Sequence, residues 1–460
     1  MAQAPVRTPA LEDTGTFVRT MLRLAIPIAA QNLLASCMHL IDTAMVIGLG
    51  NVATAAIGVA ARWTFLTNLI YFGLASGSAA LIAQYWGARQ PDHIRKTYGL
   101  SLTCAMGAAA LYLLAALLFA PQMMRVFTDD AQLIQAGAPY LSCAAMGAFA
   151  VAYIQISCST LRATENVWLP FGVSAAGVLL NTALNYGLIY GKFGLPALGL
   201  RGAALATVIA QYLQVAGLFA VSAVKKQVIT GKLRAFFGWS RQTVAHYLKI
   251  AMPVVANEGL WALGTNVYGM VLARQGTENY AAYTIFNSIE QLAFVFLIGM
   301  CHASSIMVGK AIGAGDRDGG WRTAKRFMVL LPVFAAVLGL CLIALRWPII
   351  GLLNIETQAA REMTALLLVI YGLWMGPRNI SYIAIVGVFR AGGDTRTGFY
   401  YDLINVFCIA IPLVCFLGLV VHVPFQWVVL GMYLGEDTIK SILCIRHFRS
   451  GKWIRKLTAA

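Results

Sequence analysis

Charged residues are scarce in this chain. Asp, Glu, Lys and Arg make up 11% of the 460 residues, whereas 59% are hydrophobic. An average soluble domain carries about 25% charged residues. The mean hydropathy of +0.73 agrees with this imbalance. The composition therefore argues against a water-soluble fold.

Motifs for metal, redox and enzymatic chemistry are missing as well. The nine cysteines stand singly without a C-x-x-C pair, and the six histidines form no H-E-x-x-H. The glycine-rich stretches 313–319 and 390–396 lack the G-x-x-x-x-G-K-[ST] pattern of a phosphate loop. No Ser/His/Asp set has a diagnostic spacing. We expect no enzyme and no cofactor other than a coupling ion.

Acidic residues are the rarer charge, with 18 Asp and Glu against 34 Lys and Arg and a net charge of +16. In a membrane protein, such an excess marks the cytoplasmic loops. The segment 225–246 illustrates this, because it carries Lys225, Lys226, Lys232, Arg234 and Arg241. With the N-terminus inside, most basic residues fall on the cytoplasmic side. We therefore expect both termini in the cytoplasm and no nucleic-acid partner.

Long hydrophobic runs are abundant, and each is long enough to cross a hydrocarbon core as a helix of about 20 residues. The first run is too long for a cleaved signal peptide and is expected to remain as a span. The predicted fold class is an all-α polytopic membrane protein with twelve transmembrane helices. The predicted spans are 17–47, 54–86, 97–120, 131–158, 167–191, 199–224, 247–273, 280–309, 322–345, 361–389, 399–421 and 425–446.

The sequence repeats itself. An offset of 226 residues aligns LRLAIPIAA at 22–30 with LKIAMPVVA at 248–256, and it pairs Gly73 with Gly299 and Gly87 with Gly313. Because the offset spans an even number of helices, the two copies enter the membrane in the same direction. The prediction is two six-helix bundles related by a parallel repeat. Its parts are a cytoplasmic leader 1–16, an N-lobe 17–224, a cytoplasmic linker 225–246, a C-lobe 247–446 and a basic cytoplasmic tail 447–460.

Ionisable groups inside membrane spans are costly and point to function. At a rise of about 1.5 Å per residue, Asp42, Asn181, Asn185 and Thr207 share one layer of the first half. Asn181 and Asn185, four residues apart, project from one helix face beside the Asp42 carboxylate. Their oxygens suit a hard cation such as Na⁺, and the carboxylate alone suits a proton. The alternative is a hydrogen-bond network that only joins helices.

The second half offers its own candidates, Glu258, Glu290, Arg378 and Asn379. By depth, Glu258 can pair with Arg378, next to Asn379, and Glu290 can pair with Arg62. An ion pair between Arg62 and Asp42 would weaken the ion-site hypothesis. Asp402 is expected near a helix end at the interface.

Two prolines at repeat-related positions, Pro27 and Pro253, lie inside predicted helices. A helix-interior proline leaves a carbonyl unpaired and kinks the helix. We expect these positions to allow helix bending. Ordinary distortion without a role in transport is the alternative.

Several motifs together resemble the multidrug and toxic compound extrusion (MATE) family. They are Pro27, IDT at 41–43, AQYWGA at 83–88, LRA at 161–163, LNTALN at 180–185, IYG at 189–191, GAALAT at 202–207, Pro253, Asn257 with Glu258, VGKAIGAG at 308–315 and RAGGD at 390–394. The resemblance implies two helical bundles with a central cleft, and export of organic compounds in exchange for Na⁺ or H⁺. Asp42 is similar to the coupling carboxylate of the family's N-lobe and Glu258 to the C-lobe acid. Asn379 stands where some members carry an aspartate, which favours the N-lobe as the ion site.

These inferences predict a secondary antiporter that expels amphipathic, often cationic, compounds in exchange for Na⁺ or H⁺ at Asp42. We expect a monomer in the bacterial inner membrane. The alternatives are a lipid-linked precursor flippase of the same superfamily and a non-coupled membrane channel. Few intramembrane bases argue against the flippase, and uphill transport would exclude the channel.

Overall fold

The computed structural model describes residues 13–353, 355 and 357–459, and within them the secondary structure is helical without a strand. Residues 1–12 of the predicted leader and residue 460 of the predicted tail lie outside the described residues. The all-α fold class is confirmed.

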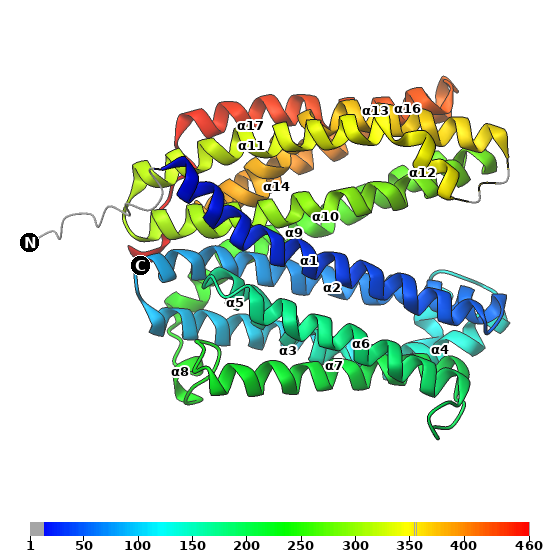
Figure 1. Ribbon diagram of the computed structural model, residues 1–460, viewed down its shortest axis with the longest axis horizontal. Helices are drawn as coiled ribbons and strands as arrows, with labels where there is room; N and C mark the ends of the chain where they lie inside the picture. The colour runs from blue at the N-terminus through cyan, green and yellow to red at the C-terminus, as the bar shows by residue number, and fades with distance from the viewer. Residues whose placement is uncertain (1–12, 354, 356, 460) are drawn as a thin grey trace, which may run out of the picture. The chain divides into compact units, whose positions relative to one another are not determined.

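The helices follow one another with short connections (Figure 1). The first part of the chain forms α1 (Thr14–Ile47), α2 (Asn51–Gly87), α3 (Pro91–Arg125), α4 (Ala131–Ala145), α5 (Ala148–Ala163), α6 (Trp168–Tyr190), α7 (Gly199–Val224) and α8 (Arg234–Phe237). The second part forms α9 (Arg241–Ala273), α10 (Thr277–Gly313), α11 (Arg317–Ala344), α12 (Arg346–Leu352), α13 (Gln358–Tyr382), α14 (Thr395–Asp402), α15 (Ile411–Cys415), α16 (Phe425–Tyr433) and α17 (Ile439–Ser450). Between them lie the π-helical segments η2 (Ile383–Phe389), η3 (Leu403–Ala410), η4 (Phe416–Val420) and η5 (Leu434–Thr438), and η6 (Leu457–Ala459) closes the chain.

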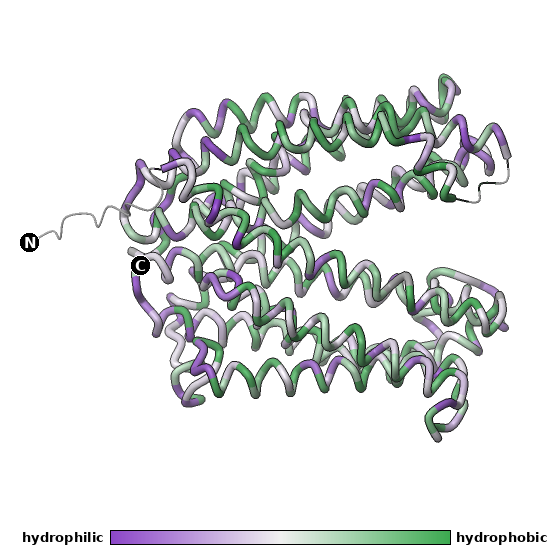
Figure 2. Tube along the Cα trace, viewed as in Figure 1, coloured by the Kyte–Doolittle hydropathy of each residue, from purple (hydrophilic) through white to green (hydrophobic). Residues whose placement is uncertain are grey.

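The long helices are apolar along most of their length, as the colouring of Figure 2 shows. Among the described residues, eight helices are long and apolar enough to cross a membrane, or nine if the bent pair of α4 and α5 counts as one span. Three more predicted spans fall in α9, in α13 with η2, and in α16 through α17. These three runs carry the charged residues Glu258, Arg378 and Lys440, which lower their hydropathy. A protein with many membrane spans is confirmed, and the count of twelve stays a prediction.

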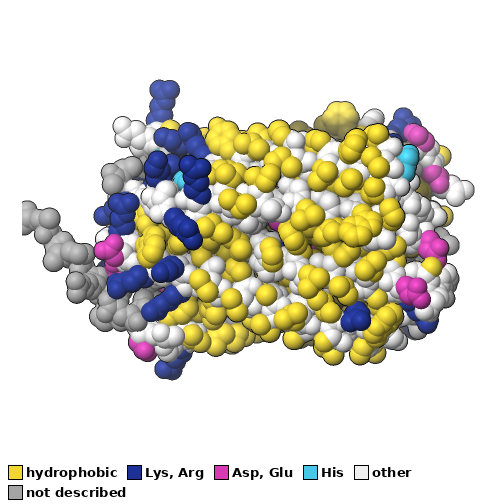
Figure 3. All heavy atoms as spheres, turned by 90° about the horizontal axis from the view of Figure 1, so that it is seen from above, with side chains coloured by type: hydrophobic (Ala, Val, Ile, Leu, Met, Phe, Trp, Pro, Cys, Tyr) yellow, Lys and Arg dark blue, Asp and Glu magenta, His cyan; other side chains and the backbone are white. Residues whose placement is uncertain are grey.

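The surface side chains also separate into apolar and charged regions. In Figure 3, hydrophobic side chains cover most of the visible face, and most of the visible Lys and Arg side chains lie toward its two ends. An apolar surface of this kind suits contact with lipid, because a soluble protein rarely exposes contiguous apolar area on that scale.

The chain divides into two compact units. One comprises residues 1–29, 83–89 and 256–460, and the other comprises 30–82 and 90–255. The boundaries after residues 29 and 255 lie 226 residues apart, the offset of the repeat. Each boundary follows a helix proline, Pro27 in α1 and Pro253 in α9, by two residues. Each half thus contributes the start of its first helix to the unit that holds most of the other half.

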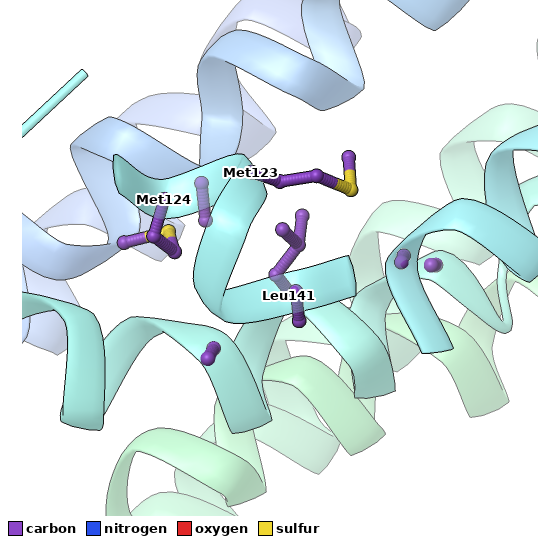
Figure 4. Packing of buried hydrophobic residues seen from close by; sticks show 8 residues of the cluster. Met123, Met124 and Leu141 are labelled. Atoms are coloured by element: carbon purple, nitrogen blue, oxygen red, sulfur yellow. The ribbon is translucent and has the colours of Figure 1, made fainter. Parts of the chain in front are cut away.

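In the unit of residues 30–82 and 90–255, small residues let the helices pack closely. Met123, Met124 and Leu141 fill the space between α3 and α4 (Figure 4), together with alanines of α2, α3 and α4. Tyr140 packs against this cluster and also against Val46 and Ile189 of a neighbouring one. The predicted linker contains α8, whose Phe236 is buried against Gly99 of α3.

In the unit of residues 1–29, 83–89 and 256–460, α10, α11 and α13 pack against one another. The segment after α17 belongs to this core, since Trp453 is fully buried. The Gln84 side chain holds this segment, because its Oε1 accepts from the backbone N–H of Leu457 at 2.8 Å and its Nε2 donates to the Arg455 carbonyl at 3.2 Å. The same nitrogen also donates to the Ala391 carbonyl at 2.8 Å. The predicted tail therefore packs into this unit as far as Leu457.

Candidate ion-coupling site

Asp42 lies near the end of α1, and its carboxylate accepts a hydrogen bond from a side chain of α6. The amide nitrogen of Asn185 donates to Asp42 Oδ1 at 2.6 Å. The same nitrogen donates to Asn181 Oδ1 at 3.0 Å. Asn181 in turn donates to the Thr207 hydroxyl of α7 at 3.2 Å. The structure thus places the four residues predicted for the first half in one connected network.

Helix geometry explains this arrangement. Asn181 and Asn185 are four residues apart in α6 and therefore lie on one face of that helix. α6 packs against α7, which brings Thr207 into the same layer. Both asparagines are fully buried or nearly so, at 0% and 1% exposure, and Asp42 is half-buried. A polar network this deep is expected to be hydrogen-bonded, because an unpaired buried polar group is costly.

One oxygen of the network is nevertheless unpaired. Asn185 Oδ1 is buried and has no hydrogen-bond partner within the described parts of the chain. Together with the Asp42 carboxylate, this oxygen offers a hard cation the type of ligand that Na⁺ uses. Such an arrangement can hold a cation or, alternatively, a proton on Asp42.

Tyr140 is a neighbour of this site that sequence reasoning missed. Its side chain on α4 interacts electrostatically with Asp42. No pattern in the sequence singled it out, because a tyrosine in an apolar span usually belongs to the packing.

Arg62 does not compete for Asp42. Its side chain is exposed on α2, and in the described part of the structure it forms no ion pair with Asp42. The arrangement that would have weakened the ion-site hypothesis is therefore not present.

In the second half, the predicted pair of Glu258 and Arg378 is wrong. Glu258 of α9 accepts a hydrogen bond from Arg390 at 2.8 Å. Arg378 of α13 instead donates to Glu290 of α10 at 2.7 Å. The depth estimate fixed only the position along each helix, whereas α10 is the helix that packs against α13 and presents its acid there.

The predicted pair of Arg62 and Glu290 is wrong for the same reason, since Glu290 pairs with Arg378. Asn379 is buried at 1% exposure, and its amide donates to the Met375 carbonyl of its own helix at 2.7 Å. The four candidates of this half therefore do not form one site. Glu290 and Arg378 lie together, and Glu258 and Asn379 have separate partners.

Sequence reasoning also missed three charged residues of the last predicted span, Glu436, Asp437 and Lys440. The Lys440 ammonium lies 3.2 Å from Glu436, 3.6 Å from Asp437 and 3.3 Å from Asp402. Asp402, which was expected near a helix end at the interface, is largely buried in this contact. The i, i+3 and i, i+4 spacing of the three residues on one helix face was the signal that could have found them.

Comparisons with known proteins agree with this architecture. The family model MatE matches residues 27–187 and 253–416, two segments that begin 226 residues apart. A probable multidrug resistance protein NorM of Thermotoga maritima is 22% identical over 97% of this chain and 95% of its own length. A relative of the same description in Bradyrhizobium diazoefficiens is 27% identical over 94% of this chain and 92% of its length.

Solved structures share the fold. A mutant of the Vibrio cholerae MATE transporter VcmN superposes with a TM-score of 0.85 and 20% identity over 96% of this chain and 99% of its own. A MATE in a straight conformation gives 0.84 and 17% over 94% and 95%. Because the family model covers well over half of the residues and the two matched segments follow the internal repeat, the chain belongs to the multidrug and toxic compound extrusion family of membrane transporters.

Proposed function

We propose that this protein is an ion-coupled efflux antiporter that exports amphipathic, often cationic, organic compounds in exchange for Na⁺ or H⁺. The observation that carries the proposal is the network of Asp42, Asn185, Asn181 and Thr207. A half-buried carboxylate in a membrane span is energetically costly, and such residues commonly bind a cation or a proton. The relatives described as multidrug resistance proteins support the substrate class.

The coupling step follows from charge. When an ion binds or a proton neutralises Asp42, the local charge changes by one unit in a region of low dielectric, where such a change is worth several kcal/mol. That energy can shift the balance between two conformations only if each binds the ion with different affinity. The unpaired Asn185 oxygen is a ligand whose pairing differs between the ion-bound and the ion-free network.

Bending of α1 near Pro27, and of α9 near Pro253, is the proposed mechanical response. The residues that follow these prolines by two are the points at which the chain passes from one compact unit to the other. Solved MATE structures in a straight and in a bent conformation support the idea of two states. We further propose that the protein works as a monomer in the bacterial inner membrane with both termini in the cytoplasm and without a nucleic-acid partner.

The boundaries of the lobes, 17–224 and 247–446, belong to the same proposal. The Lys- and Arg-rich segments then lie on the cytoplasmic side, as the charge distribution favours. Protease protection of tags in 225–246 and at the C-terminal end would test this orientation. Protection of both tags from protease in intact inside-out vesicles, which expose the cytoplasmic face, would contradict it.

The deciding experiment is dye efflux from vesicles reconstituted with the full chain, with a Na⁺ gradient and a pH gradient imposed separately. Asp42→Asn should abolish efflux driven by whichever ion couples. The matched control is Asp129→Asn, which removes an exposed carboxylate from the same unit and should leave efflux unchanged. Undiminished uphill efflux by Asp42→Asn would refute the assignment. Absence of uphill movement in the unchanged protein would favour the channel alternative.

A further inference from the structure

Six charged side chains meet inside the unit that holds most of the second half. We refer to them as the Lys440 cluster: Glu290 of α10, Arg378 of α13, Asp402 of α14, Glu436 and Asp437 of η5, and Lys440 of α17. Arg378 links the two ion-pair groups, because it interacts electrostatically with Glu436 and Asp437 as well as with Glu290. Their exposed fractions range from 2% for Asp437 to 23% for Arg378. They are separate from the Asp42 network, which belongs to the other unit.

The positions within the cluster are well defined. Arg378 binds Glu290 at 2.7 Å, and its guanidinium lies 5.3 Å from the ring centre of Tyr433. Lys440 lies between Glu436 at 3.2 Å and Asp402 at 3.3 Å. Each of these two cations is therefore already held by carboxylates at close range.

The charges of the cluster do not balance. The four carboxyl groups of Glu290, Asp402, Glu436 and Asp437 face the two cations Arg378 and Lys440. If all six were ionised, the cluster would carry two uncompensated negative charges. A net charge buried in a membrane span is costly, and each proton taken up by a carboxylate lowers that net charge by one unit.

Asp437 is the carboxyl group of the cluster whose negative charge has the weakest ion-pair and hydrogen-bond contacts. It lies 3.6 Å from Lys440, farther than the other two carboxylates, and accepts only a long bond of 3.4 Å from the Ser381 hydroxyl, on Oδ1. Its Oδ2 is buried and has no hydrogen-bond partner among the residues that the structure describes. The Tyr433 hydroxyl is also buried and unpaired there. A protonated Asp437 would be neutral and would need no cation beside Oδ2.

A proton fits this place better than a metal ion. The Lys440 ammonium already occupies the position among three carboxylates, and it would repel a second cation. The described residues contain no group of three or more His, Cys, Asp and Glu that could hold a metal ion. Glu436 and Asp437 interact electrostatically as like charges, which disfavours ionisation of both and favours a proton on one of them.

We propose that the Lys440 cluster is a proton-binding site separate from the Asp42 network, with Asp437 as the group that takes up and releases the proton. In the step, the Asp437 carboxylate and a proton from water form a carboxylic acid, and release reverses it. Besides Glu436 and Lys440 on its own helical run, the titratable groups around Asp437 are Tyr268 of α9, Glu290 of α10, Arg378 and Tyr371 of α13, Asp402 of α14, and Cys444 of α17. The two cations that face Asp437 are shared with other carboxylates, Arg378 with Glu290 and Lys440 with Glu436.

Infrared difference spectroscopy of the purified full chain during a pH titration tests the proposal, because a protonated carboxyl has its own C=O stretching band. The unchanged protein should show a titrating band that Asp437→Asn removes. Asp42→Asn should retain that band, and Asp129→Asn should change only the signal of exposed carboxyl groups. A band of unchanged amplitude and midpoint in Asp437→Asn would overturn the proposal.

Two further variants shift the titration in opposite directions. Lys440→Gln removes a positive charge, so the proton affinity of Asp437 should rise by tenfold or more. Glu436→Gln removes a negative charge, so the affinity should fall by a similar factor. Either variant decides the matter if Asp437→Asn does not fold, and a midpoint that stays in place would contradict the proposal. The measurement uses no ion gradient and no dye, so its outcome is independent of the transport function proposed for Asp42.

Discussion

Arg390 donates a hydrogen bond of 2.8 Å to Glu258, and both side chains are largely buried. The first half has a counterpart, in which Arg162 donates to Gln31 at 3.1 Å. Arg162 and Arg390 occupy matching positions in the repeat, and Gln31 aligns with the residue just before Glu258. The arginine within the LRA motif at 161–163 and the FRA motif at 389–391 therefore anchors the first helix of its own half in both copies.

This relationship predicts a structural role for Glu258. Glu258→Ala leaves Arg390 without its carboxylate and should lower the free energy of unfolding by about 3 kcal/mol, as the loss of one partner of a buried pair does. Glu258→Gln keeps an acceptor like that of Gln31 and should cost clearly less. Thermal unfolding of the purified protein in detergent measures both. Gln31→Ala, which removes a neutral acceptor, should cost about 1 kcal/mol. Equal stability of Glu258→Ala and the unchanged protein would contradict the prediction.

Asn185 should set the affinity for the coupling ion. Asn185→Leu removes both the donor to Asp42 and the unpaired oxygen, and a hydrogen bond to a charged group is worth about 1.5–3 kcal/mol. The ion concentration for half-maximal efflux should therefore change by about tenfold or more. The control is Thr182→Val in the same helix, because the Thr182 hydroxyl donates to the Val178 carbonyl of that helix at 2.9 Å and not to the Asp42 network. An unchanged ion dependence in Asn185→Leu would show that the network only joins helices.

Pro27 and Pro253 should affect turnover more than ion affinity. Replacing either by Ala restores a backbone donor to its helix and removes the weak point at which bending is proposed. We expect each variant to slow efflux severalfold while the half-maximal ion concentration stays within a factor of two of its original value. Pro332→Ala within α11 is the control, since no unit boundary lies near it. Full efflux rates in both Pro27→Ala and Pro253→Ala would remove the support for bending.

Gly87 and Gly313 make a reciprocal contact that no larger residue can make. A methyl group on Gly87 would collide with the Lys310 carbonyl oxygen, and one on Gly313 with the Gln84 carbonyl oxygen. Lys310 is the repeat partner of Gln84, so the contact is symmetric. Either glycine replaced by Ala should lower the free energy of unfolding by about 1–3 kcal/mol. Gly107→Ala in α3, where a Cβ meets no described atom within 4 Å apart from its chain neighbours and the backbone of its own helix, should raise the free energy of unfolding slightly. A neutral outcome for both contact glycines would show that the helices separate without cost.

Much of the architecture follows from sequence because it depends on one-dimensional periodicities. Hydrophobic length predicts spans, and the offset of 226 predicts the repeat that the two matched family segments share. The grouping of Asp42 with Asn181, Asn185 and Thr207 was also predictable. Two of these residues share one helix face by spacing, and depth along a helix follows from counting residues.

Only the tertiary structure decided which charges pair. Counting residues gives the depth of Glu258, Arg378 and Glu290, but a side chain also needs a rotation about its helix axis and a neighbouring helix. Those depend on packing between segments distant in sequence. The pairs Arg390 with Glu258 and Arg378 with Glu290, and the enclosure of Lys440 by three carboxylates, arise from that packing. A membrane helix carries its hydrophobic length in its own residues, whereas the partner of a buried charge is set by the helices that surround it.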